Sequence, residues 1–228
     1  MDHFPGDFKE PPQFESGVVC TVESSARQWF CTGYYVAAGI TIQVNIVDSQ
    51  GAKGWSARIG CHSDDLRNCN EYRRWNCISI TKPLVQQSTD LSSAFGGLLF
   101  LESPEANSSV ITVSISRVVL APCYNTADAN RAQTWPFQQA NAQGLWADIA
   151  GKYIIFNVPS TSIRKINSEE LDRALNHWDN VVLAHHRLVG TKPTRRERIV
   201  CDEQPSHGYM RRMMMKEYFF VFFYVIIL

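Results

Sequence analysis

The stretch Gly39–Leu66, GITIQVNIVDSQGAKGWSARIGCHSDDL, decides the fold. Its first half alternates apolar and polar residues from Ile40 to Ile46, which is the period-two pattern of a strand with one buried face. Residues 48–54 contain the Asp and Gly of a turn, and residues 55–61 return as a second strand. The pattern predicts a β-hairpin, followed by a polar loop that begins at Cys61.

Further short strands are expected on both sides of this stretch. One is expected over residues 29–36, which are rich in aromatics, and a short one over 78–80, before Pro83. Residues 96–101 are continuously apolar and are predicted to form a strand buried on both faces. Residues 111–115 alternate apolar and polar side chains, as in a strand with one buried face. The weakly patterned N-terminal residues, to about residue 27, are expected to be an extended lead-in, and the polar residues 64–74 a surface loop. Six strands separated by turn signals predict a jelly-roll-like β-sandwich over residues 15–125, after a lead-in over residues 1–14.

The pattern changes after Tyr124. A strand is expected over residues 153–158, and a helix over 168–188, because Asn167 and Glu170 have the spacing of a capping box. The apolar stripe predicted to face inward consists of Leu171, Ala174, Leu175, Trp178, Val181, Val182 and Leu188. We therefore expect an α/β segment over residues 126–210, and an α+β fold for the chain as a whole.

Composition excludes some classes of protein. The 228 residues include 22 Lys and Arg and 22 Asp and Glu, so the formal net charge is zero. No basic stripe occurs before the last residues, and this pattern is not that of a nucleic-acid-binding protein. The start of the chain has no secretory signal, and the seven cysteines contain no Cys-x-x-Cys pair. We expect a cytoplasmic chain with reduced thiols.

The C-terminal segment is apolar. The eleven residues 218–228 would extend about 16 Å as a helix. The hydrocarbon core of a bilayer is about 30 Å thick. The segment therefore predicts shallow membrane association at most, and its exposure in half a domain predicts poor solubility.

The loop after residue 60 contains four candidate metal ligands, Cys61, His62, Asp64 and Cys69. Their spacing matches no zinc motif, and they mix soft and hard ligands. A loop whose backbone N–H groups donate hydrogen bonds to Asp side chains explains the pattern better. Ser63 does not form a triad with its neighbours, because adjacent residues do not place a nucleophile, a base and an orienting group in line.

The remaining histidines also lack a catalytic pattern. No His is followed by Glu, so the His-Glu-x-x-His motif of zinc peptidases is absent. His185 and His186 are adjacent and point about 100° apart on a helix. His185 lies on the apolar stripe and is predicted to be a core histidine, while His177 and His207 are isolated. By its residues alone, the chain has no identifiable active site.

A glycine pair, Gly96 and Gly97, precedes the continuously apolar strand. The pair lacks the Lys-Ser/Thr of a phosphate-binding loop. It therefore predicts a tight turn or a close approach between strands.

An ordered set of short motifs resembles the peptidase M60, enhancin-like family. The motifs are WFCTGYYVAAG at 29–39, IGCHSDDL at 59–66, GGLLFL at 96–101, WADI at 146–149, VPS at 158–160, LNHWD at 175–179 and RIVCDEQPSHGYM at 198–210. Within that family the chain is similar to the vertebrate TRPM8 channel-associated factors, which are intracellular proteins.

The resemblance implies a fold and several possible functions. In the family the Gly-Tyr-Met segment continues into a catalytic half with His-Glu-x-x-His. Here Met210 is followed by residues 211–228, which resemble nothing in the family, so the chain is expected to be truncated before that half. No catalytic, metal or cofactor residue is carried over, and zinc is expected only in a full-length catalytic domain.

Three functions follow from the resemblance. The first is a non-catalytic regulatory module that binds a TRPM-type ion channel and so lies at the plasma membrane. The second is part of a zinc metallopeptidase that acts on glycoproteins. The third is a glycan-binding sandwich in which Trp29, Trp55 and Trp75 stack on sugars.

Overall fold

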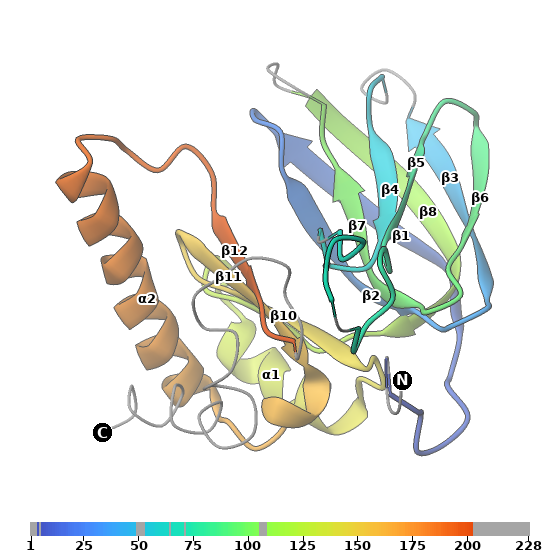
Figure 1. The fold of residues 1–228 in the computed structure, drawn as a ribbon. Coiled ribbons are helices and arrows are strands. Elements are labelled where there is room, and N and C mark those ends of the chain that lie inside the picture. The colour runs from blue at the N-terminus through green and yellow to red at the C-terminus, as the bar shows by residue number, and fades with distance from the viewer. Residues whose placement is uncertain are drawn as a thin grey trace.

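The computed structural model describes residues 4, 6–48, 53–63, 65–70, 72–104 and 109–202. The predictions for Asp64, His207 and the segment 211–228 lie outside these residues. The described part forms an α+β fold, in which a large antiparallel β-sandwich stands beside a smaller mixed sheet (Figure 1).

Eight strands build the predicted β-sandwich. They are β1 (Glu15–Ser24), β2 (Trp29–Val36), β3 (Thr41–Asp48), β4 (Ser56–Ile59), β5 (Ile80–Pro83), β6 (Ser88–Ser92), β7 (Gly97–Glu102) and β8 (Ser109–Leu120). One layer contains β1, β8, β3 and β6, and the other contains β2, β7, β4 and β5. The end of β8 also pairs with β2, so the eight strands form one nearly closed sheet.

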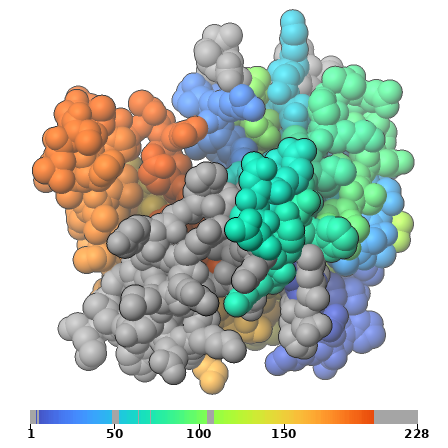
Figure 2. Space-filling model, in the orientation of Figure 1, coloured from blue at the N-terminus to red at the C-terminus, as the bar shows by residue number. Residues whose placement is uncertain are grey.

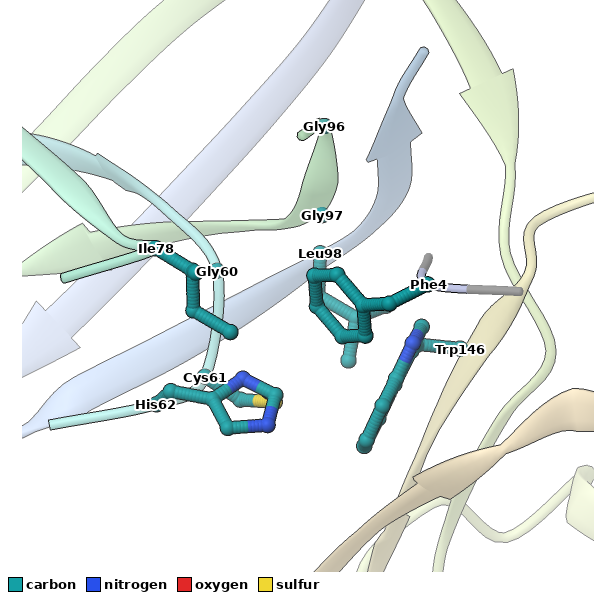
Figure 3. Close-up of a pocket in the computed structure, with 9 residues that line it drawn as sticks. All are labelled: Phe4, Gly60, Cys61, His62, Ile78, Gly96, Gly97, Leu98 and Trp146. Atoms are coloured by element: carbon teal, nitrogen blue, oxygen red, sulfur yellow. The ribbon is translucent and has the colours of Figure 1, made fainter. Parts of the chain in front are cut away.

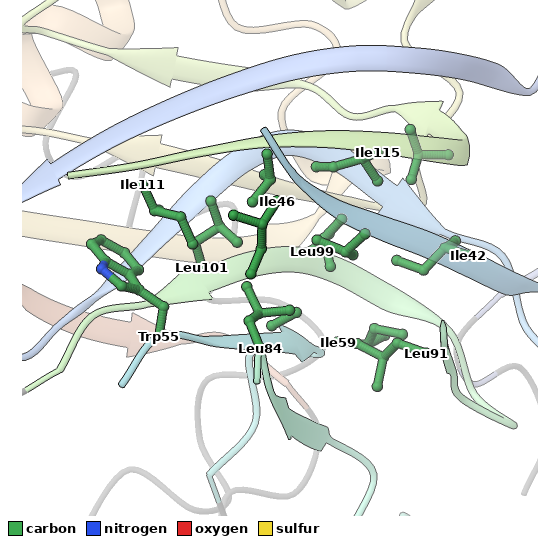
Figure 4. Close-up of a cluster of buried hydrophobic side chains, with 14 of the residues drawn as sticks. Ile42, Ile46, Trp55, Ile59, Leu84, Leu91, Leu99, Leu101, Ile111 and Ile115 are labelled. Atoms are coloured by element: carbon green, nitrogen blue, oxygen red, sulfur yellow. The ribbon is translucent and has the colours of Figure 1, made fainter. Parts of the chain in front are cut away.

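The core of the sandwich lies between the two layers. Ile42 of β3, Ile59 of β4 and Leu99 of β7 are fully buried there with the Trp55 side chain (Figure 4). The prediction for the apolar strand is confirmed, because β7 is buried on both faces. Leu99 faces this core, whereas Leu98 packs in a second cluster with Trp146.

The predicted hairpin of residues 39–61 is wrong. β3 pairs with β6 and β8, whereas β4 pairs with β5 and β7 in the opposite layer. Both strands have one buried face, and the two faces meet across the core, so the strands stand opposite each other rather than side by side. The alternation was sufficient to identify the strands but contains no information about their partners.

Three other differences concern the edges of the sandwich. The lead-in expected to residue 27 contains the strand β1, most of whose outer positions are exposed. The strand expected at 78–80 is β5, Ile80–Pro83, an exposed edge strand in which proline is tolerated. The loop predicted to lie on the surface over 64–74 does so in part, because Leu66 and Arg74 are buried.

The second unit is a four-stranded mixed sheet with helices. Its strands are β9 (Cys123–Asn125), β10 (Trp146–Ala150), β11 (Ile154–Pro159) and β12 (Glu197–Val200), in the order β12-β11-β10-β9. The helices α1 (Arg131–Asn141) and α2 (Ser168–Leu188) and the short 3-10 turn η1 (Ser160–Ser162) accompany it. β9 lies in this sheet, although its residues fall within the range expected for the sandwich.

The long helix begins as predicted. The Asn167 side chain accepts a hydrogen bond from the Glu170 backbone, and the Glu170 carboxylate accepts one from the Asn167 backbone, so the capping box is confirmed. Leu171 and Leu175 are fully buried, and Trp178 is half-buried against Phe156, with ring centroids 5.5 Å apart.

The predicted stripe is wrong toward the end of α2. Val181 is 41% exposed and Leu188 is 87% exposed, and His185 is exposed rather than a core residue. The buried side chains of α2 end at Val182, because the last turns extend past the packed part of the sheet; that end of the helix stands away from β12 in the view of Figure 1. A periodic pattern shows which side chains share a face but not where the covering element ends.

Candidate functional site

The polar loop after β4 is held by a buried ion-pair cluster. His62 Nε2 lies 2.7 Å from Asp202 Oδ2, and Arg74 donates from Nη2 to Asp202 Oδ1 at 2.6 Å and from Nε to Oδ2 at 2.9 Å. All three residues are less than 10% exposed. Asp202 follows β12, so the cluster joins the smaller sheet to the sandwich.

The electrostatics of the cluster favour an ionised Asp202. Burial by itself would raise the pKa of this carboxyl, but hydrogen bonds from His62 and Arg74 outweigh burial and lower the pKa to about 2. A buried carboxylate with a bidentate Arg partner and a second donor has its hydrogen-bonding capacity satisfied. The arrangement is that of a structural ion pair.

Aromatic side chains enclose the cluster. The His62 and Trp146 rings meet edge to face at 5.1 Å, and the Arg74 guanidinium lies 4.6 Å from the centre of the Phe4 ring. Together with Cys61 and other residues, Phe4, His62 and Trp146 line a cavity of about 10 Å³ (Figure 3). Such a cavity holds no more than one water, so it excludes a substrate.

Cys61, His62 and Asp202 occur in the order of a Cys-His-Asp triad. The Cys61 Sγ lies 3.7 Å from His62 Nδ1, and the other ring nitrogen faces Asp202. Burial, however, raises the pKa of the Cys61 thiol far above its usual value. A thiol that stays protonated beside a water-sized cavity is a packing residue, not a nucleophile.

The same residues do not fit a zinc ion. His62 Nε2 faces Asp202, and both oxygens of Asp202 already accept hydrogen bonds from Arg74, so neither group presents a free ligand atom to a metal. Among the residues that the structure describes, no three His, Cys, Asp or Glu side chains come together as a possible metal site. Cys69 is half-buried in the loop and Ser63 is exposed.

The other candidates are dispersed. His177 is exposed, and His186 Nδ1 lies 2.7 Å from Thr191 Oγ1. The prediction for the glycine pair is confirmed: a Cβ on Gly97 would lie 2.7 Å from the Gly60 Cα, and Gly97 has a φ of 145°. Close approach of the two backbones therefore requires glycine.

The three tryptophans differ in access. Trp55 is buried and donates to Ser109 Oγ at 2.6 Å, so it is not available to stack on a sugar. Trp29 is half-buried beneath the Arg58 guanidinium, 4.0 Å from the ring centre. Trp75 is 57% exposed.

Sequence reasoning missed Arg74 and Asp202. They are separated by 128 residues, and each lies in a segment that reads as a polar loop. It also missed Asp179 of α2, whose carboxylate accepts hydrogen bonds from the backbone of Lys152, Tyr153 and Ile154. No local pattern indicates such contacts. Arg and Asp are common surface residues, and a backbone N–H group as a partner leaves no mark in the sequence.

Comparison with known proteins defines the class to which this fold belongs. The family model of the N-terminal domain of M60-like peptidases matches residues 12–116, and the model of peptidase M60, enhancin and enhancin-like proteins matches residues 118–220. The chain therefore belongs to the M60-like peptidase family. The second match includes the first ten residues of the segment 211–228, so the end of the match does not coincide with the predicted boundary at 211.

Among curated proteins the chain is similar to TRPM8 channel-associated factors. Human TRPM8 channel-associated factor 2 is 30% identical over 185 residues, which are 80% of this chain and 20% of the relative. A homolog from Xenopus laevis is also 30% identical, over the same shares of the two chains. The chain thus spans about a fifth of the length of these relatives.

Solved structures show the same fold. The IMPa metallopeptidase from Pseudomonas aeruginosa superposes with a TM-score of 0.64 and 16% identity, over 89% of this chain and 28% of that one. A conserved protein of unknown function from Bacillus anthracis gives a TM-score of 0.66 and 14% identity, over 83% and 42%. None of the helices that the structure describes combines the length and the apolar composition that a membrane span requires.

Proposed function

We propose that this chain is a non-catalytic M60-like module that binds a TRPM-type ion channel and regulates it. The similarity to TRPM8 channel-associated factor 2 over 80% of the chain carries this proposal. The shared region includes both the sandwich and the smaller sheet, so a surface for the partner can be built from either unit or from both. Binding to the channel would place the chain on the cytoplasmic side of the plasma membrane.

The chemistry of the described residues supports a role without catalysis. The triad-like arrangement of Cys61, His62 and Asp202 is closed by packing and contains a thiol with a raised pKa. The sequence contains no His-Glu-x-x-His. In this proposal a zinc ion belongs only to longer members of the family that include the catalytic half.

One alternative retains support. The peptidase M60 family model matches residues 118–220, and the IMPa fold occurs in a structure described as a complex with T-antigen. These observations favour an origin as part of a zinc metallopeptidase that acts on glycoproteins. In that case this chain would supply the scaffold beside the catalytic half.

Co-precipitation tests the proposed partner. The tagged 228-residue chain is incubated with detergent-solubilised membranes that contain TRPM8, and the recovered channel is quantified. The matched control is a segment of the Pseudomonas aeruginosa IMPa that has the same fold at 16% identity. We expect several-fold more channel with the chain than with the control, and a shift of channel current when the two are co-expressed. Equal recovery with both proteins would overturn the proposal.

A further inference from the structure

A cleft of about 490 Å³ lies between the sandwich and the smaller sheet. Gln28 and the first three residues of β2 form one wall, and residues 193–196 before β12 form another together with Arg198 of β12. Residues of β9, β10 and β11 complete the lining. In Figure 2 the orange-red segment that precedes β12 lies beside the blue surface of the sandwich. The volume is within the range of ligand-binding sites in proteins, about 300–1,000 Å³.

The lining of the cleft is strongly cationic. Its charged residues are Lys152, Arg195, Arg196, Arg198 and a single acid, Asp148. Asp148 is already paired with Arg198, whose Nη1 lies 2.8 Å from its Oδ2. Over the described ranges, no ion pair joins the other three cations to a carboxylate, and Arg196 makes one long hydrogen bond of 3.4 Å to Asn125.

Positive charges are crowded in this cleft. Burial lowers the pKa of Arg196; Asp148 and Asp179 act in the opposite direction, and Arg198 adds a smaller lowering effect. Arg198 also repels Arg58, whose pKa is lowered mainly by burial and is raised in part by Glu102. An incoming anion would offset both the lost hydration and the mutual repulsion of these groups.

The same cleft has apolar and aromatic walls. They are formed by Trp29, Phe30, Tyr153, Ile155 and Pro193. A small inorganic anion would use only the arginines and leave these walls and most of the volume unfilled. A peptide with carboxylate and apolar side chains matches both features, since guanidinium groups bind carboxylates bidentately and apolar side chains pack on aromatic rings.

We propose that this cleft binds an acidic peptide segment. Its carboxylates pair with Arg195 and Arg196, and its apolar side chains pack against Trp29 and Tyr153. The proposal is independent of the identity of the partner protein, so it stands whether or not the chain binds a channel.

Fluorescence anisotropy tests this site in the full 228-residue chain. The probe is a fluorescein-labelled octapeptide that alternates Glu with Leu and Phe, and the reference probe has Gln in place of each Glu. The test variant is R195A/R196A, in the cleft. The control is R173A/R187A, which removes the same charge from exposed positions on α2. Circular dichroism of both variants verifies the fold.

We expect saturable binding of the Glu peptide that weakens at least tenfold in R195A/R196A and less than twofold in R173A/R187A. The Gln peptide should bind at least tenfold more weakly than the Glu peptide, and added NaCl should weaken binding of the Glu peptide. Equal losses in both variants would overturn the proposal. So would full competition by inorganic phosphate at the concentration of the peptide, or binding to phosphatidylserine vesicles without binding to the peptide.

Discussion

Asp202 and His62 are 140 positions apart in the chain, yet Asp202 Oδ2 lies 2.7 Å from His62 Nε2 in the interior of the protein. Arg74 completes the pair from a third segment, so one carboxylate connects the end of β12 to two parts of the sandwich loop. The residues that look most like a catalytic triad are therefore those that hold the two units together.

Removal of this carboxylate should destabilise the fold strongly. Asp202→Asn removes the buried carboxylate charge that Arg74 and His62 share, and breaking a buried pair costs about 3–5 kcal/mol. Urea unfolding followed by tryptophan fluorescence measures the loss. Asp65→Asn is the control, because Asp65 pairs with Arg67 on the surface, and it should change the free energy of unfolding little. Equal effects of the two substitutions would contradict the structural role of Asp202.

The same carboxylate predicts a dependence on pH. The pKa of Asp202 is about 2 in the folded chain. In the unfolded chain it should be near the ordinary value of about 4. The stabilisation that the Asp202 carboxylate adds to the free energy of unfolding is therefore present above about pH 4 and is lost as the pH falls toward 2. The difference in unfolding free energy between wild type and Asp202→Asn should shrink over this range. A constant difference from pH 5 to pH 2 would show that the carboxylate does not act through its charge.

The inward face of α2 predicts a graded series. Leu175 is 1% exposed, so Leu175→Ala should cost about 2–5 kcal/mol. Trp→Ala at a fully buried site costs about 3–5 kcal/mol. Trp178 is only half-buried, so Trp178→Ala should cost less than that. Leu188→Ala, at an exposed position, should stay within about 0.5 kcal/mol of wild type. Thermal melts of the three variants test the order, and a large loss in Leu188→Ala would restore the stripe predicted from the sequence.

Local signals explain what could be predicted. The capping box of Asn167 and Glu170 placed the start of α2 because both partners lie within one helical turn. The apolar run at β7 and the alternation in β3 identified those strands for the same reason. The pairing of β3 with β8 could not be predicted, because sandwich partners are separated by long connections and chosen by the packing of the whole core.

The candidate site was predictable only in part. The loop at His62 attracted notice from its composition, but its partners Arg74 and Asp202 come from distant segments with no shared pattern. The basic cleft was missed for a similar reason: Lys152 and Arg196 come together only when β11 pairs with β12, which lies far along the chain.

Close approach of two backbones predicts a cost at Gly97. A Cβ at this position would lie 2.8 Å from the Gly60 backbone nitrogen. Gly97→Ala should therefore lose about 1–2 kcal/mol from its backbone conformation and about 1–3 kcal/mol more from overpacking. Gly33→Ala is the matched control, since Gly33 also has a positive φ but has no atom within 4 Å of its Cβ position. Chemical denaturation should show the larger loss at Gly97, and equal losses would exclude a steric role for the close approach.

Cysteine reactivity should follow exposure. Cys77 is exposed, whereas burial raises the pKa of Cys20 and raises that of Cys201 to about 12. Ellman's reagent at pH 8 should show a fast phase that Cys77→Ser removes and Cys20→Ser retains. A fast phase that persists in Cys77→Ser would mean that a thiol assigned to the interior is accessible.

Cleavage by the purified 228-residue chain tests the central claim of a binding module without catalysis most directly. The chain is incubated with casein and with a mucin-type glycopeptide, with added Zn²⁺ or with a chelator, and products are separated by mass spectrometry. The account predicts no product above the level of a no-protein blank in either condition. Zinc-dependent cleavage that the chelator abolishes would contradict it.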